Sequence, residues 1–335
     1  MRVLVVDDSA FMRKIITDML SSDPVINVVG TANDGEDALK KIPVLHPDVI
    51  TLDVNMPRMD GLSTLKEIMK RHPLPVIMLS SLTQRGASTT IESLANGAID
   101  YVAKPSGEVS MDLEKVKGDL IFKVKLAASA KTKIFKPDLS KPSVVKAKKE
   151  YKTRIITIGA STGGPAALMT VLPRLPRDVP PILLVQHMPS DFTKPFSERL
   201  DSNSKVTVKE ASEGDKIVPG QALLAPGDYH MVVKKNGSVS LNKKPKIHGV
   251  RPSVDPMMTS AADLFGSETL GVVLTGMGRD GSAGVIAIKK KNGQNIVQNE
   301  SSCVVYGMPG EAVKTGCIDK IVPLNRIARE IIRRC

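Results

Sequence analysis

The chain has 335 residues, of which 41% are hydrophobic and 24% charged, a composition typical of a soluble globular protein and not of a disordered or fibrous one. Its formal net charge is +12, but aromatic residues make up only 3% of it, which leaves few side chains for stacking on nucleic-acid bases. No apolar run reaches the roughly 18 residues of a membrane span, and the N-terminal apolar segment is shorter than a secretory signal requires. We therefore expect about two domains, no nucleic-acid partner and no membrane insertion.

The cysteines Cys303, Cys317 and Cys335 are odd in number and widely spaced, and no two of them have the CxxC spacing. This pattern argues against a disulfide framework or a thiolate zinc site and favours a reducing compartment. We expect a cytoplasmic protein, and we expect it to be a monomer.

Residues 1–127 alternate between short Val/Ile-rich runs and amphipathic segments. The apolar runs predict strands buried on both faces, at 2–6, 26–31, 49–53, 76–80 and 101–103. Helices are expected between them, and the first, over 9–20, places Phe11, Ile15 and Met19 on one apolar stripe. Five such units predict a flavodoxin-like domain with a five-stranded parallel sheet.

Residues 128–150 are rich in Lys, Pro and Ser without a sustained period, which predicts an extended linker that holds much of the excess positive charge. A second α/β pattern fills residues 151–335. Its strands are expected at 154–158, 182–186, 270–274 and 295–298, and its helices at 165–172, 192–200, 280–290, 309–314 and 325–334. Asp191 is the expected N-cap of the second of these helices.

Residues 205–242 interrupt that pattern with short strands separated by turn residues. They predict β-hairpins, most clearly at Asn236-Gly237. The whole of 151–335 is therefore expected to be a doubly wound, mostly parallel α/β domain with a β-hairpin insertion.

Acidic residues lie at the ends of two strands of the first domain. Asp7 and Asp8 follow the first strand, and Asp53 ends the third, which should be central. Because the carboxyl ends of parallel strands meet at one edge of a sheet, we expect these carboxylates to lie together, where their repulsion favours a bound Mg²⁺. Lys104 and Ser80, at two further strand ends, would bind the oxygens of a phosphoryl group. Asp53 is the natural phosphoryl acceptor because its strand is central. The alternative is that Asp7 and Asp8 only cap the first helix.

The segments VVDDS, LDVNMPRMDG, MLSS and YVAKPS together resemble those of response-regulator receiver domains, over essentially all of residues 1–127. The resemblance implies that a histidine kinase phosphorylates Asp53. It implies that Asp8, Asp53 and the backbone carbonyl of Asn55 bind Mg²⁺, with Asp7 in support. Receivers often carry an acidic residue where Asn55 stands, so the local charge differs here. The residues implied to contact or respond to the phosphoryl group are Ser80, Lys104 and Tyr101.

Residues 159–163 match the pattern G-x-S-x-G between a predicted strand and a predicted helix. Such a turn exposes its serine, Ser161, and directs backbone N–H groups at a developing oxyanion. The alternative is an ordinary glycine-rich helix start. His187 ends the next strand, 26 residues after Ser161, so the two side chains are expected at the same edge of the sheet. This placement favours a nucleophile and a general base.

Residues 276–281 allow two interpretations. Their G-x-G-x-x-G pattern, with Glu300 19 residues further on, fits a dinucleotide-binding turn. Alternatively, Asp280 orients His187 and stabilises its imidazolium. We prefer the triad because the dinucleotide interpretation leaves Ser161 and His187 unexplained. The order Ser161, His187, Asp280 differs from that of α/β-hydrolases.

GASTGGP, VQHMP, SVDPM and LTGMGRDG together resemble segments of the catalytic domain of chemotaxis receptor methylesterases, the CheB family, over residues 151–335. The resemblance implies hydrolysis of glutamate methyl esters, and deamidation of glutamines, on the cytoplasmic helices of chemoreceptors. It implies Ser161 as nucleophile, His187 as base and Asp280 as orienting acid, with no cofactor at that site. The backbone N–H groups of Thr162 and Met277 would form the oxyanion hole.

A receiver joined to a hydrolase suggests a switch in which the unphosphorylated receiver blocks the Ser161 edge and phosphorylation by the chemotaxis histidine kinase releases it. Three alternatives stay open at this point: a DNA-binding output domain, a nucleotide-binding enzyme based on residues 276–281, and an inactive scaffold.

Overall fold

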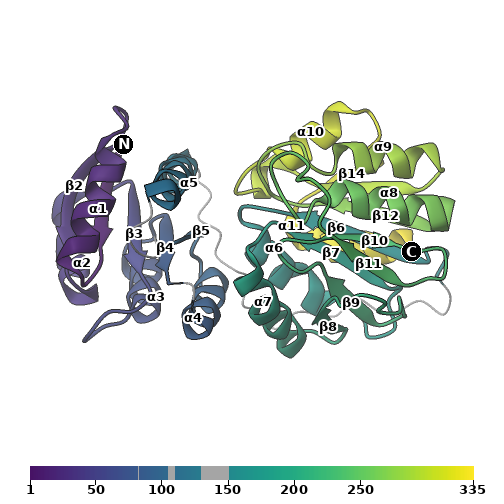
Figure 1. The fold of residues 1–335 in the computed structure, drawn as a ribbon, viewed down its shortest axis with the longest axis horizontal. Helices are drawn as coiled ribbons and strands as arrows, with labels where there is room; N and C mark the ends of the chain where they lie inside the picture. Colours follow the sequence, from purple (N-terminus) through teal and green to yellow (C-terminus); the bar gives the residue numbers. More distant parts are fainter. Residues whose placement is uncertain (82, 105–109, 130–150) are drawn as a thin grey trace. The chain divides into compact units, whose positions relative to one another are not determined.

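The structure is a computed structural model that describes residues 1–81, 83–104, 110–129 and 151–335, and these form two compact units that are described separately (Figure 1). Most of the expected linker, 128–150, lies outside the described residues. The last helix of the first unit ends at Ser129, two residues beyond the expected limit at 127. The domain limits at 127 and 151 stay predictions.

The first unit has a five-stranded parallel sheet in the order β2-β1-β3-β4-β5. This order is that of flavodoxin-like folds and confirms the predicted architecture. The β3 and β4 segments, VITLD and VIMLS, are buried throughout, as their unbroken apolar sequence indicated. The strands are β1 (Arg2–Val6), β2 (Asn27–Ala32), β3 (Val49–Asp53), β4 (Val76–Ser80) and β5 (Asp100–Ala103).

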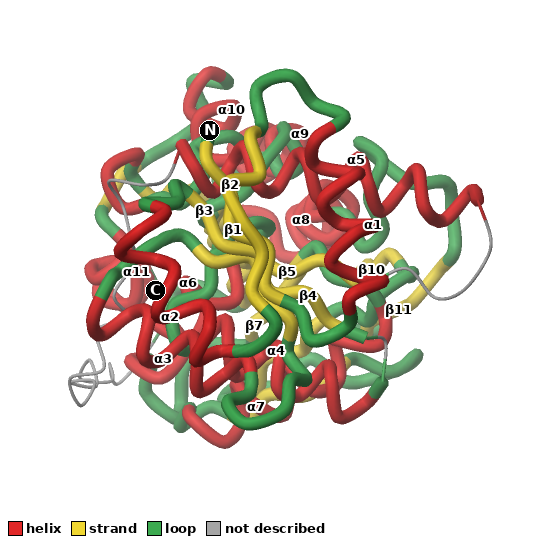
Figure 2. The backbone as a smooth tube through the Cα atoms, turned by 90° about the vertical axis from the view of Figure 1, so that its left-hand side faces the viewer, coloured by secondary structure: helices red, strands yellow, loops and turns green. Residues whose placement is uncertain are grey.

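Helices cover both faces of this sheet, with α1 and α5 on one side and α2 and α3 on the other (Figure 2). The predicted apolar stripe of α1 was wrong in part: Phe11 is 72% exposed, and the buried residues are Ile16, Met19 and Leu20. The first turn of α1 lies at the sheet edge where β1 ends, so burial begins later along the helix. The helices are α1 (Ala10–Ser21), α2 (Gly35–Leu45), α3 (Gly61–Arg71), α4 (Gln84–Ala95) and α5 (Ser110–Ser129).

The second unit has a seven-stranded sheet in the order β14-β13-β12-β6-β7-β9-β8, and every pairing in it is parallel. A separate antiparallel pair, β10–β11, is the predicted hairpin at Asn236-Gly237. The strands are β6 (Ile155–Ala160), β7 (Ile182–Gln186), β8 (Thr207–Glu210), β9 (Gln221–Leu224), β10 (His230–Val233), β11 (Val239–Asn242), β12 (Thr269–Val273), β13 (Gln294–Gln298) and β14 (Lys320–Val322).

The prediction of several hairpins over 205–242 was wrong for β8 and β9. These strands are parallel and extend the main sheet beyond β7. The β9 residues Ala222–Leu224 are buried, and this burial is gained by pairing with β7. The Pro-Gly turn residues before β9 mark a chain reversal but do not determine the direction in which the next strand pairs.

Helices α8, α9 and α10 cover one face of this sheet, and α6, α7 and α11 cover the other (Figure 1). Helix α8 and strand β14 were not predicted. The prediction of Asp191 as an N-cap was wrong: α7 begins at Ser190, Pro189 is its N-cap, and Asp191 lies within its first turn. The helices are α6 (Gly164–Val171), α7 (Ser190–Asn203), α8 (Val254–Phe265), α9 (Ser282–Lys290), α10 (Met308–Lys314) and α11 (Leu324–Arg334).

Short 3₁₀ turns follow α6 at Leu172–Arg174, follow α8 at Gly266–Glu268, and follow β13 at Glu300–Ser302. Within the described ranges, none of the helices combines the length and the hydropathy needed to cross a bilayer. The three cysteines carry free thiols.

Candidate active site and phosphoryl-acceptor site

Ser161 and His187 lie at neighbouring positions on the carboxyl edge of the second sheet. Strands β6 and β7 are adjacent and parallel, and their last residues, Ala160 and Gln186, are register partners. The His187 N–H donates to the Ala160 carbonyl at 3.1 Å, and the Gln186 side-chain amide donates to the Ser161 carbonyl at 2.9 Å. The turn residue and the histidine are therefore held side by side.

Glycines make room for this arrangement. Gly163 has φ +74°, a left-handed conformation that favours glycine. A Cβ on Gly164 would lie 2.1 Å from the Gln186 carbonyl oxygen Oε1, and a Cβ on Gly276 would lie 2.7 Å from the Ser161 Cβ. The loop that begins at Gly276 therefore packs directly against Ser161.

His187 is hydrogen-bonded to Asp280, with Nε2 and Oδ2 2.7 Å apart. Because an ionised carboxylate only accepts, Nε2 carries the proton and Nδ1 is the nitrogen left to act as a base. Among the described residues no hydrogen bond joins the Ser161 hydroxyl to His187. Catalytic hydrogen bonds are often loose before substrate is bound.

Asp280 is 1% exposed and accepts hydrogen bonds at both oxygens. Oδ1 accepts from the Ser253 hydroxyl at 2.7 Å, and Oδ2 accepts from the Val254 N–H at 2.7 Å, at the start of α8. Burial alone would raise the pKa of Asp280, but the bonds from His187, Ser253 and Val254 outweigh it and hold that pKa below its usual range. The carboxylate is therefore ionised at neutral pH and suited to stabilise an imidazolium.

Two backbone N–H groups beside Ser161 have no partner within the part of the chain that the structure describes. They belong to Thr162, in the turn after β6, and to Met277, in the loop that begins at Gly276. These are the N–H groups that the family resemblance implies for an oxyanion hole. Donors that are free in the resting protein are able to bind an oxyanion without first breaking another hydrogen bond.

The dinucleotide interpretation of residues 276–281 conflicts with the start of α9. There the Gly281 and Gly284 N–H groups both donate to Asp255 Oδ1, at 2.9 and 2.8 Å. A pyrophosphate would need these same N–H groups at the helix N-terminus. Glu300 lies in the short 3₁₀ turn after β13.

Ser253 and Asp255 were missed as functional residues by sequence reasoning. Asp280, just before α9, accepts from the Val254 and Asp255 N–H groups of α8, while Asp255 accepts from the start of α9. A carboxylate at the start of each helix therefore accepts hydrogen bonds from the N–H groups at the start of the other helix. The SVDPM segment was the only sequence signal, and it indicated no role.

The first unit gathers its acidic residues as expected. Lys104 Nζ lies 2.7 Å from Asp7 and 2.8 Å from Asp53, and both aspartates are buried while Asp8 is exposed. One carboxylate oxygen of each of Asp7, Asp8 and Asp53 lies within 4.8 Å of those of the others. The alternative that the first two aspartates cap α1 was wrong, because the N-cap is Ser9, whose side chain accepts from the Met12 N–H.

The electrostatics of this cluster favour a cation. Burial and the charge of Asp7 raise the pKa of Asp53, and Lys104 offsets this only in part. Burial would lower the pKa of Lys104, but its contacts with Asp53 and Asp7 outweigh burial and raise it. Oxygen ligands at this spacing fit Mg²⁺, which would relieve the remaining repulsion. Asn55, the other expected ligand, is exposed at the same edge.

Ser80 and Tyr101 are the other two residues that are expected to contact or respond to the phosphoryl group. The buried Ser80 hydroxyl accepts from Thr90 at 2.7 Å and lies 3.2 Å from the Ser81 carbonyl. The Tyr101 ring is 6% exposed, with Lys123 5.2 Å from its centroid. Among the described residues, Ser80 makes no hydrogen bond to Asp53.

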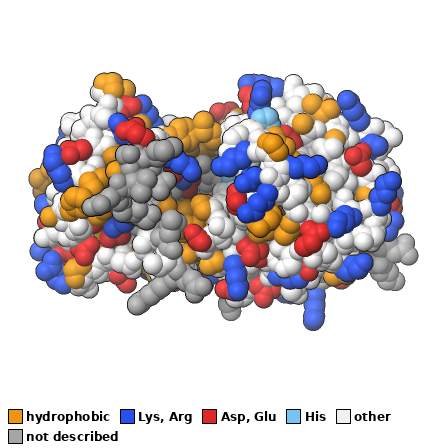
Figure 3. All heavy atoms as spheres, in the orientation of Figure 1, with side chains coloured by type: hydrophobic (Ala, Val, Ile, Leu, Met, Phe, Trp, Pro, Cys, Tyr) orange, Lys and Arg blue, Asp and Glu red, His pale blue; other side chains and the backbone are white. Residues whose placement is uncertain are grey.

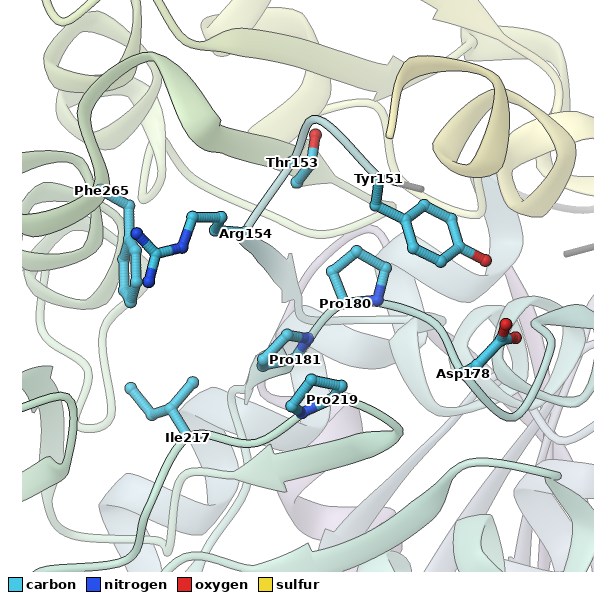
Figure 4. Close-up of a pocket in the computed structure, with 9 residues that line it drawn as sticks. All are labelled: Tyr151, Thr153, Arg154, Asp178, Pro180, Pro181, Ile217, Pro219 and Phe265. Atoms are coloured by element: carbon cyan, nitrogen blue, oxygen red, sulfur yellow. The ribbon is translucent and has the colours of Figure 1, made fainter. Parts of the chain in front are cut away.

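The second unit also has a pocket whose lining includes several prolines and the aromatic rings of Tyr151 and Phe265 (Figure 4). Its volume is about 310 Å³. Arg154, Pro181 and Pro219 among its lining residues directly precede β6, β7 and β9, or lie within two residues of them. They mark the amino edge of the sheet, opposite the edge that holds Ser161.

The positive charge of the chain does not form one continuous patch on the face drawn in Figure 3. Lys and Arg side chains of the second unit are interspersed there with Asp and Glu. Such a surface has little of the single-sign character of a nucleic-acid footprint.

A parallel five-stranded sheet with a cluster of aspartates and a lysine at its carboxyl edge, followed by a second α/β domain with its own polar edge, defines a response regulator with an α/β output domain. Residues 3–114 match the response regulator receiver domain, and residues 156–331 match the CheB methylesterase family. The chain belongs to the CheB methylesterase family.

Curated relatives match almost the whole chain. Proteins of Pyrococcus horikoshii and Pyrococcus abyssi, both named protein-glutamate methylesterase/protein-glutamine glutaminase, are 49% and 48% identical over 343 aligned residues. Each alignment covers 99% of this chain and 93% of the relative. The crystal structure of the Thermotoga maritima CheB methylesterase catalytic domain is 43% identical, with a TM-score of 0.53, and covers 55% of this chain and 99% of that one.

Proposed function

We propose that the chain removes methyl esters from glutamate side chains of chemoreceptors and deamidates receptor glutamines, by a Ser-His-Asp mechanism. The observation that carries this proposal is the hydrogen bond from His187 to Asp280 at the edge where β6 and β7 place Ser161 and His187 side by side. The names of the relatives, whose alignments span the whole chain, support the same substrate class.

In the first half-reaction, His187 Nδ1 accepts the Ser161 hydroxyl proton as Oγ attacks the ester or amide carbonyl carbon. The carbonyl π electrons move to oxygen, and the Thr162 and Met277 N–H groups bind the resulting oxyanion. The tetrahedral adduct collapses, and the proton held by His187 goes to the leaving methoxide or amide nitrogen. Methanol or ammonia departs and an acyl-enzyme ester on Ser161 is left.

In the second half-reaction, water takes the place of the serine. Nδ1 accepts a proton from water as its oxygen attacks the acyl carbon, and the same proton then returns to Ser161 Oγ as it leaves. The product is a glutamate side chain from either substrate. Asp280 stays ionised throughout and stabilises the imidazolium formed in each half.

The first unit is proposed to be the phosphoryl acceptor, with Asp53 as the nucleophile and a chemotaxis histidine kinase as donor. Asp8, Asp53 and the Asn55 carbonyl would hold Mg²⁺, which supplies charge neutralisation for the transferred group. Lys104, which already lies 2.8 Å from Asp53, would bind a phosphoryl oxygen. The Ser80 hydroxyl, now bonded to Thr90, would have to turn to reach another.

Phosphorylation at Asp53 is proposed to activate the hydrolase by relieving inhibition of access to Ser161. The test compares the full chain with residues 151–335, each with and without a small phosphodonor and Mg²⁺. We expect the isolated second unit to be active without the phosphodonor and the full chain to need it. Equal activity in all four samples would remove the regulatory part of the proposal.

A serine-directed phosphonate probe tests the nucleophile separately from regulation. We expect the probe to label Ser161 in residues 151–335, as located by peptide mass spectrometry. Ser161→Ala should not be labelled, and His187→Ala should be labelled far more slowly. Labelling at another serine, or equal labelling of His187→Ala, would overturn the proposed mechanism.

A further inference from the structure

A second histidine–aspartate pair, His248 and Asp255, lies next to Asp280 of the proposed catalytic pair. His248 belongs to the segment 243–253 that joins β11 to α8, and its side chain is 26% exposed. Its Nε2 lies 3.1 Å from Asp255 Oδ2, and its Nδ1 lies 3.2 Å from Arg279 Nε. Neither the mechanism above nor the sequence motifs use this histidine.

The two partners indicate which tautomer the His248 ring adopts. A guanidinium N–H is only a donor, so Nδ1 accepts from Arg279, and Nε2 carries the proton that is donated to Asp255. His248 therefore joins a donor on one side to an acceptor on the other, and its geometry is set by both. A side chain that lacks either function would break one of these links.

Arg279 belongs to the loop that carries two parts of the proposed machinery. Met277 lies two residues before it and Asp280 directly after it. Asp280 is held from the start of α8, whereas residues 277–279 are exposed and include Gly278, whose φ is +85°. Among the described residues, a side chain of this exposed stretch is anchored to the rest of the unit by the hydrogen bond from Arg279 to His248, which we call the tether.

Asp255 connects the same histidine to the other end of the loop. Its Oδ2 accepts from His248, and its Oδ1 accepts from the Gly281 and Gly284 N–H groups. The chain of contacts runs from Arg279 through His248 and Asp255 to Gly281, so it brackets Asp280 from both sides. A shift of His248 is therefore transmitted to the loop at two points.

Metal binding does not explain this cluster. Ligand atoms of His248, Asp255 and Asp280 lie within 4.8 Å of one another. Each of the four carboxylate oxygens, however, already accepts from an N–H or O–H group. A cation would have to displace those donors, together with the N–H groups at the starts of α8 and α9 that bond to the same oxygens.

We propose that His248 is a positioning residue that holds the loop 276–281 so that the Met277 N–H is aimed at the oxyanion. This inference rests on the proposed function, because it assigns the N–H a role in ester and amide hydrolysis. The role requires a donor and an acceptor at one position. Glutamine offers the same pair through its amide N–H and carbonyl, whereas leucine offers neither.

The experiment compares His248→Leu, His248→Gln and Arg279→Leu in residues 151–335, with Lys246→Leu as a control for an altered surface of the same segment. Methanol release from a methylated receptor fragment gives kcat and KM. Complete loss of one oxyanion donor costs about 10²–10³ in rate, so misplacement should cost about tenfold or more. We expect His248→Leu and Arg279→Leu to lower kcat at unchanged KM, and His248→Gln to stay within about threefold of wild type.

The double variant His248→Leu/Arg279→Leu should be no slower than His248→Leu alone, because His248→Leu already removes the link to Arg279. A merely structural role would lower the melting temperature with kcat unchanged, or would give additive losses, and either result overturns the inference. Amide hydrogen exchange at Gly281 and Gly284, whose N–H groups donate to the Asp255 carboxylate that His248 contacts, supplies a readout that does not depend on hydrolysis. We expect faster exchange in His248→Leu and not in His248→Gln or Lys246→Leu.

The two levels of the proposal fail differently. If wild type releases no methanol, or Ser161→Ala releases as much, the hydrolase proposal fails, and hydrogen exchange still decides whether His248 holds the loop. If wild type is active and His248→Leu matches it in kcat and in exchange, only the role of His248 is overturned.

Discussion

Asp280→Asn tests the electrostatic centre of the proposed active site. The carboxylate accepts five hydrogen bonds, from His187, Ser253, Val254, Asp255 and the Gly281 N–H. An asparagine keeps one oxygen. If this oxygen takes the Oδ1 position, the side-chain NH₂ takes the Oδ2 position and faces the two N–H donors there, from His187 and Val254. In the reverse orientation the NH₂ faces the three donors at the Oδ1 position.

At least two of those bonds are therefore lost. Hydrogen bonds to charged groups contribute about 1.5–3 kcal/mol each, so the free energy of unfolding should fall by about 3–6 kcal/mol before any relaxation. The His187 ring can avoid the clash only by accepting at Nε2, which moves its proton to Nδ1. That tautomer cannot accept the Ser161 proton, and we expect kcat to fall by about 10⁴.

The pH dependence of the free energy of unfolding tests the same carboxylate independently of catalysis. The pKa of Asp280 in the folded protein lies below the usual aspartate value of 3.8, so the stability that it contributes is fully present above about pH 4 and is lost as the pH falls through the folded-state pKa. The difference in unfolding free energy between wild type and Asp280→Asn should therefore shrink below pH 4. Urea unfolding at a series of pH values measures it.

Asp319→Asn is the matched control, since Asp319 lies just before β14 at the amino edge and accepts from the Asn295 N–H at 2.8 Å. The Asp319→Asn variant should have a lower free energy of unfolding and an unchanged kcat. A folded Asp280→Asn variant within about tenfold of the wild-type kcat would refute the reasoning, as would a stability difference that grows towards low pH.

Three further predictions concern separate parts of the chain. Gly276→Ala places a Cβ 2.7 Å from the Ser161 Cβ and should lower kcat by about 10²-fold through displacement of the nucleophile, and an unchanged rate of methanol release would contradict this. Gly118→Ala, in α5 with no atom within 4 Å of the new Cβ, should raise the free energy of unfolding by about 0.5–1 kcal/mol in urea, and a decrease would show that the position needs glycine. Asp53→Asn should take up no phosphoryl group from a small phosphodonor by intact mass spectrometry, whereas continued uptake would place the acceptor elsewhere.

The sequence specified the first sheet well because its strands are buried on both faces. Unbroken runs such as VITLD and VIMLS have one plausible structure, and their bounds in the structure are those predicted. The spacing between Ser161 and His187 also has a simple consequence, since a βα unit of 26 residues returns the chain to the same edge. Predictions of this kind depend on local pattern and on the geometry of parallel sheets alone.

The parts that could not be predicted depend on partners distant in sequence. Helix α8 begins after a proline, and its first N–H groups bond to Asp280, which lies more than twenty residues later. Strand β9 follows turn residues that equally suit a hairpin, but it pairs in parallel with β7 on one side and with β8 on the other. His248 carried no motif, because its role follows from contacts with Asp255 and Arg279 that the fold alone creates.

Methanol release from a methylated chemoreceptor fragment is the most direct test of the central claim. We expect release by residues 151–335, and its loss in Ser161→Ala and in His187→Ala, with both variants folded to the same melting temperature within a few degrees. Release by either variant at the wild-type rate would contradict the account.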